Sequence, residues 1–137
     1  MKRFIATTAA ILTAGTAFAA GHAMAPMIEG SDQDVSGGTV TASKIVASEN
    51  GWLVVHRTGE DMKPGVVVGH APIKMGENMD VSAILTEEVA SGDMLMLMVH
   101  SEAGGEKTGI FEYTLGAKED GPVKPDGELV MTTITAE

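Results

Sequence analysis

The fold is decided by two stretches, GWLVVHR at residues 51–57 and MLMLMVH at residues 94–100. Successive side chains of a strand point to opposite faces, and both stretches carry apolar residues at both sets of alternate positions. A strand that is apolar on both sides is covered on both sides. We therefore expect these strands in the middle of a sheet, with Trp52 buried, because it supplies the largest apolar surface in a chain that is only 4% aromatic.

Similar short runs recur along the whole chain, separated by Gly, Pro, Asn and Asp. This punctuation is typical of an antiparallel arrangement rather than of alternating strands and helices. The sequence therefore predicts an all-β fold, an antiparallel immunoglobulin-like β-sandwich of seven to eight strands. The expected strands lie near residues 27–33, 39–47, 51–57, 66–71, 79–85, 94–100, 110–115 and 129–135.

The N-terminus has the features of a signal peptide. A basic start, Lys2-Arg3, precedes a short apolar run and the small-residue site Ala17-Phe18-Ala19. Cleavage after Ala19 divides the chain into a signal peptide (1–19), a flexible tail (20–27) and a β-sandwich domain (28–137). We expect the mature protein in the periplasm or secreted. Membrane insertion after cleavage is not expected, because no later segment has the ~20 apolar residues that a spanning helix needs.

The charge of the chain excludes some partners. The net charge is −10, and removal of Lys2 and Arg3 with the signal peptide takes it to −12. Such a surface repels phosphate backbones, so nucleic acid is not an expected partner. The chain has no cysteine, which rules out both disulfides and a blue-copper site. A protein of unknown identity or a metal ion remains as the partner.

Several short segments occur in a fixed order from about residue 32 to the end: Gly51–His56, Val67–Gly69, Asp80–Leu85, Met98–His100, Phe111–Tyr113 and Asp120–Pro122. They resemble an uncharacterised extracellular β-sandwich domain family that is common in surface proteins of salt-loving archaea and is found in exported bacterial proteins. The family has no assigned activity, so the resemblance implies a fold and a location only. The chain departs from the pattern at Glu102, where the family usually has an aspartate.

The tail offers the first candidate metal site. If the mature chain begins Ala20-Gly21-His22, the free amine, two backbone amides and the imidazole can supply four nitrogens in one plane, a geometry typical of Cu(II) or Ni(II). Thioethers favour Cu(I), so Met24 and Met27 would let the same tail hold copper through a change of redox state. The alternative is that a histidine stands at this position by chance.

A second candidate site lies at one end of the domain. Met98 and His100 share a strand face, and alternating strand directions would bring His70 to the same end, with His56 at the opposite end. The metal hypothesis therefore includes His70, Met98 and His100. The alternatives are that each histidine ring bonds a loop carbonyl, and that the abundant methionines fill gaps in the core.

No recognisable catalytic motif is present, which predicts that the protein is not an enzyme. Two functions remain. One is an exported, non-enzymatic module with an interaction or structural role and no certain cofactor. The other is a periplasmic copper-handling protein that uses the N-terminal amine, histidine and methionine. The acidic residues around Gly121-Pro122 are interpreted as turn residues.

The tail hypothesis gives a direct prediction. The mature protein should bind one Cu(II) with a visible absorption band of tetragonal nitrogen coordination, and His22→Ala should abolish this band, because it removes one of the four nitrogens. An extra residue before Ala20 should weaken binding, since it moves the amine away. A band that survives His22→Ala would refute the site.

Overall fold

A computed structural model of the protein describes residues 24–137. The expected signal peptide and the candidate ligands Ala20, Gly21 and His22 lie outside the described residues. Within residues 24–137, no helix is both long and apolar enough to cross a membrane. The elements are β1 (Met27–Glu29), β2 (Thr39–Ala47), β3 (Gly51–Thr58), β4 (Val67–Ile73), β5 (Gly76–Leu85), β6 (Met94–Ser101), a short 3-10 helix η1 (Pro125–Gly127) and β7 (Met131–Thr135).

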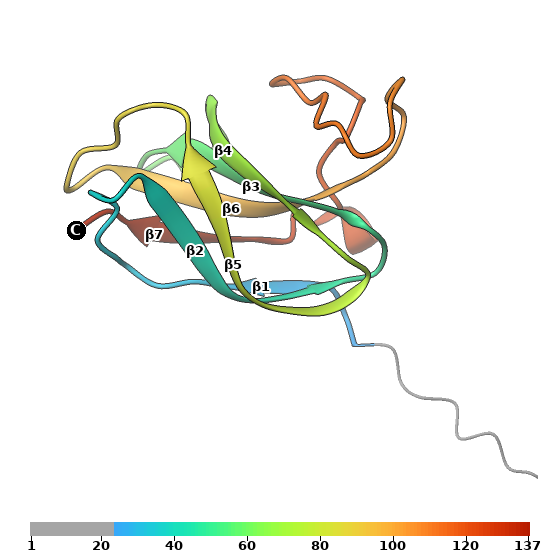
Figure 1. The fold of residues 1–137 in the computed structure, drawn as a ribbon, viewed down its shortest axis with the longest axis horizontal. Coiled ribbons are helices and arrows are strands. Elements are labelled where there is room, and N and C mark those ends of the chain that lie inside the picture. Colours follow the sequence, from blue (N-terminus) through green and yellow to red (C-terminus); the bar gives the residue numbers. More distant parts are fainter. Residues whose placement is uncertain (1–23) are drawn as a thin grey trace, which may run out of the picture.

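The seven strands form one antiparallel sheet in the order β1-β2-β5-β4-β3-β6-β7. The sheet rolls up until β1 contacts β6 and β7, so that it is nearly closed (Figure 1). The predicted all-β class and the strand number are confirmed. A division into two separate sheets is not confirmed, because β4 and β5 stay joined by the pairs Gly69–Leu85 and His70–Ile84.

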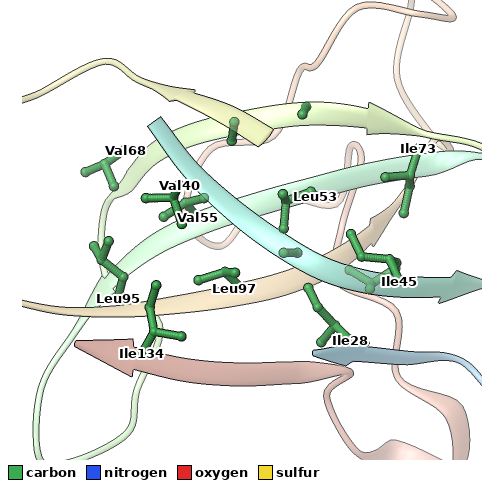
Figure 2. Close-up of a cluster of buried hydrophobic side chains, with 14 of the residues drawn as sticks. Ile28, Val40, Ile45, Leu53, Val55, Val68, Ile73, Leu95, Leu97 and Ile134 are labelled. Atoms are coloured by element: carbon green, nitrogen blue, oxygen red, sulfur yellow. The ribbon is translucent and has the colours of Figure 1, made fainter. Parts of the chain in front are cut away.

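The inner face of the rolled sheet holds the main core. Figure 2 shows its aliphatic side chains pointing inward from the surrounding strands. Leu53, Val55, Leu95 and Leu97, at alternate positions of β3 and β6, are fully buried in this cluster. The period-two pattern of residues 51–57 and 94–100 therefore predicts correctly that these alternate residues share one buried face of the sheet.

The outer face of β3 and β6 is buried as well. Trp52 is 6% exposed, and Val54, Met96 and Met98 are 1% exposed or less, although none of them belongs to the inner cluster. β3 lies between β4 and β6, and β6 lies between β3 and β7. The expectation of two central strands with a buried Trp52 is confirmed.

The cover over this outer face includes a segment that the sequence predicted wrongly. Residues 110–115, expected as a strand, belong to an irregular segment between β6 and β7, and Figure 1 shows this segment, in orange, as loops that lie outside the sheet. Gly109 and Gly116, which bracket the expected strand, adopt positive φ angles that bend the chain. The backbone N–H of Glu112 donates to the Asp120 carboxylate instead of to a neighbouring strand.

The contact between β3 and β6 depends on a glycine. A Cβ atom at Gly51 would lie 2.0 Å from the backbone oxygen of His100, whereas a Cβ at Gly37 would meet nothing within 4 Å. Gly51→Ala should therefore push the two strands apart and lower the free energy of unfolding by ~2 kcal/mol or more. Gly37→Ala is the matched control and should stay within ~0.5 kcal/mol of wild type. Urea denaturation measures both, and equal stabilities would contradict this packing.

Candidate functional site

Two histidines meet beneath the cover of the outer face. His56 on β3 and His100 on β6 are both fully buried, and their Nε2 atoms are 3.3 Å apart. In the strand register His56 is opposite Met96 and His100 is opposite Trp52, with the pair Val54–Met98 between these two rows. The rings therefore lean toward each other along the outer face, across the Val54–Met98 row.

Each ring is also fixed by its other nitrogen. His56 Nδ1 lies 2.8 Å from the backbone oxygen of Gly65, and His100 Nδ1 lies 2.6 Å from the backbone oxygen of Asp120. A carbonyl oxygen can only accept a hydrogen bond, so each Nδ1 must carry the proton. This tautomer leaves the Nε2 lone pair of each ring directed at the other ring.

The contacts of the two rings require one cation that the neutral pair does not supply. Its three close contacts need three hydrogen atoms, but two neutral imidazoles carry only two N–H groups. With both Nδ1 atoms protonated, two buried lone pairs face each other at 3.3 Å. Only a cation between the rings, either a third proton or a metal ion, satisfies all the contacts at once.

Burial opposes the third proton. Desolvation lowers the pKa of His100 to about 4, although the bond to the Asp120 carbonyl acts in the opposite direction. Desolvation also lowers the pKa of His56, against the effect of the Gly65 carbonyl. Near neutral pH both rings are therefore neutral, which is the protonation state that binds metals.

Aromatic side chains cover the pair. The ring of Tyr113 meets that of His100 edge to face, with 4.5 Å between centroids, and lies 6.0 Å from the ring of His56. The ring of Phe111 lies 6.3 Å from that of His100 and 5.4 Å from that of Trp52. The segment after β6 thus shields the Nε2 atoms from water with apolar surface.

Asp120 holds this cover in place. It is fully buried, and its carboxylate accepts hydrogen bonds from the backbone N–H groups of Ala103 at 3.2 Å and Glu112 at 2.8 Å. Its backbone oxygen is the acceptor for His100 Nδ1, and its φ of 46° lies in the left-handed region that aspartate tolerates. One residue therefore joins the covering segment to the histidine pair.

The structure corrects the expected neighbour of His100. His70 was expected beside it, with His56 at the far end of the domain, but the ring in contact with His100 is that of His56. β4 and β6 do run in the same direction, because both are antiparallel to β3, but β3 lies between them. His70 is exposed and stacks on Phe111 with 4.4 Å between centroids.

The methionine ligands expected from the sequence lie in different places. Met24 is exposed, and Met27, expected in the tail, pairs with Val46 as the first residue of β1. Met98 is buried on the outer face, in the row between His56 and His100. Within residues 24–137, no three His, Cys, Asp or Glu side chains come together as a metal site. Any ligand beyond the two imidazoles must therefore be of another kind, such as a thioether.

A cleft of about 890 Å³ adjoins the histidine pair on the same outer face. Trp52 and Gly51 of β3, Lys74 after β4, and Glu102 and Phe111 after β6 are among the residues that line it. Phe111 belongs both to this cleft and to the aromatic cover, and Trp52, which also lines the cleft, contacts it, so the two features share a wall.

Sequence reasoning missed three parts of this site. His56 shares its face with Trp52 and Val54, as the alternation had indicated, but strand order decides which histidine it meets. Tyr113 appeared in the expected strand 110–115 and in the family resemblance but not as a site residue, and Asp120 was interpreted as a turn residue although it is buried. Nothing in the sequence indicated that His56, Tyr113 and Asp120 come together around His100.

Comparison with known proteins assigns the chain to a family. Residues 26–137 match the model of a family described as Domain of unknown function (DUF7282), and the chain belongs to this family. This result supports the expectation of an uncharacterised domain. No curated protein and no solved structure matches the chain.

The role of Asp120 can be tested against a matched control. Asp120→Ala leaves the N–H groups of Ala103 and Glu112 without an acceptor, so it should lower the free energy of unfolding by ~2 kcal/mol and shift Trp52 fluorescence toward the red. Asp126 also has a positive φ, 54°, but is exposed and makes no side-chain hydrogen bond within residues 24–137. Asp126→Ala should change neither quantity, and equal effects of the two substitutions would show that backbone conformation alone is responsible.

Proposed function

We propose that the protein is an exported, non-enzymatic binding module that holds one Cu(I) ion between the Nε2 atoms of His56 and His100. The observation that carries the proposal is the facing of these two buried atoms at 3.3 Å while both Nδ1 atoms point at carbonyl oxygens. Metal-binding histidines typically donate their second N–H to a carbonyl or carboxylate, which fixes the ring and its tautomer.

The distance is suitable for a shared ion. Imidazole nitrogens bind a first-row metal at ~2.0–2.1 Å, and two such ligands at a tetrahedral angle are ~3.3 Å apart. The observed 3.3 Å therefore corresponds to a bent arrangement that leaves room for a further ligand. Met98, in the row between the two histidines, is the candidate for this ligand.

The surroundings favour a soft ion of low charge. A divalent ion in this buried, aromatic environment would carry a larger desolvation cost than a monovalent one. Thioether and imidazole ligands both suit Cu(I), and Met96 and Met98 line the same buried face. The absence of a cluster of three harder ligands within residues 24–137 agrees with this choice.

The remaining parts of the proposal come from the sequence. The signal-like residues 1–19 support export to the periplasm or beyond, and the missing catalytic motifs support a role in binding rather than catalysis. Residues 20–22 would form a separate Cu(II) site. We also place the fold among immunoglobulin-like sandwiches, because the two-pair link between β4 and β5 leaves β1, β2 and β5 as one layer and the other four strands as the second.

Anaerobic titration against a coloured Cu(I) chelator tests this function. In a mature protein that carries His22→Ala, so that the tail cannot contribute, one Cu(I) per chain should still bind. His100→Phe should weaken binding at least 100-fold because it removes one of the two nitrogens, and Met98→Leu should weaken it about tenfold.

His70→Phe is the matched control, since the ring of His70 lies outside the pair, and it should leave the affinity within threefold. Circular dichroism of each variant establishes that it is folded. Loss of all Cu(I) binding in His22→Ala alone, or full affinity in folded His100→Phe, would overturn the proposal.

A further inference from the structure

The cleft beside the histidine pair contains polar groups without partners. Trp52 is 6% exposed, and its indole Nε1 is buried with no hydrogen-bond acceptor within residues 24–137. Glu102 Oε2 is buried without a donor, while Oε1 of the same carboxylate accepts from the N–H of Gly109 at 3.2 Å. Buried polar groups without partners are costly, so a cleft with two of them on its walls is prepared for a ligand.

The charges of the cleft are also unpaired. Glu102 and Lys74 both line it, and within residues 24–137 neither side chain forms an ion pair. They stand on opposite sides of the first residue of β3, because Gly51 pairs with Ile73 of β4 and with Ser101 of β6. Adjacent strands lie ~4.8 Å apart, so the backbones that carry the two charged residues are separated by ~10 Å.

The rest of the wall combines apolar residues with the polar residues Asn50, His70, Asn78 and Thr108. Pro72, Ile110 and Phe111 are among the apolar residues that line the cleft, whose volume of about 890 Å³ lies within the usual range for small-molecule sites. A fitting ligand therefore has a cationic hydrogen-bond donor for Glu102, an anionic acceptor for Lys74 and the Trp52 N–H, and an apolar part.

We propose that this cleft binds a free α-amino acid with an apolar side chain, its ammonium group at Glu102 and its carboxylate at Lys74 and Trp52 Nε1. The zwitterion supplies each missing partner, since an ammonium only donates and a carboxylate only accepts. Thr108, Gly109 and Ile110, which line the cleft and are all exposed, are the part of the wall that moves to admit the ligand. This site is separate from the histidine pair, and its occupation does not require copper.

The test uses Trp52, the only tryptophan of the chain, as the reporter. Titration of the metal-free mature protein with L-leucine and L-phenylalanine should change its fluorescence saturably, and calorimetry should give one site per chain. 4-Methylvalerate, which lacks the ammonium, and isoamylamine, which lacks the carboxylate, should each bind at least tenfold more weakly than leucine.

Variants identify the groups involved. Glu102→Gln should reduce leucine affinity at least tenfold and remove the preference for leucine over 4-methylvalerate. Lys74→Met should also reduce leucine affinity at least tenfold and should remove the preference for leucine over isoamylamine. Lys124→Met, an exposed lysine outside the cleft, is the matched control and should bind like wild type.

His100→Phe, which is designed to remove copper binding, should still bind leucine, so the copper site and the amino-acid site are tested independently. No saturable response to 10 mM of either amino acid, or unchanged affinity in folded Glu102→Gln, would overturn the proposal.

Discussion

The contact between His56 and His100 links the turn at Gly65 to Asp120 and to the segment that covers the outer face. Through Nδ1, one ring is tied to the turn at Gly65 and the other to Asp120. Asp120 in turn holds the backbone at Ala103 and Glu112, on which Tyr113 and Phe111 cover the rings. Because the two Nδ1 bonds fix both tautomers, the same framework that covers the face also forces the Nε2 lone pairs together.

The outer face thus differs in chemistry from the inner core. The inner core is aliphatic and can be stabilised by packing alone, as a chain without cysteine requires. The outer face contains the buried histidines, the thioethers of Met96 and Met98, and the unpaired polar atoms of Trp52 and Glu102. Unsatisfied groups of this kind reduce stability, and they are expected where a protein binds something.

Local patterns predicted the strands well and the site poorly. Alternation placed Trp52, His56 and His100 on buried faces of central strands, because the period of two acts within each strand. The partnership of His56 with His100 depends on the order β4-β3-β6, which involves residues 44 positions apart and leaves no local pattern. Residues 110–115 resembled a strand because they are apolar and aromatic, but their surface covers the sheet instead of joining it.

The most direct measurement of the central claim is the protonation state of each imidazole nitrogen, from long-range proton–nitrogen NMR spectra of the ¹⁵N-labelled mature protein at pH 7.5. Before copper is added, both His56 and His100 should show a protonated Nδ1 and an unprotonated Nε2. One equivalent of Cu(I) should then shift both Nε2 resonances and leave both Nδ1 atoms protonated. A proton on Nε2 of either ring in the metal-free protein, or Nε2 resonances that do not respond to Cu(I), would contradict the account.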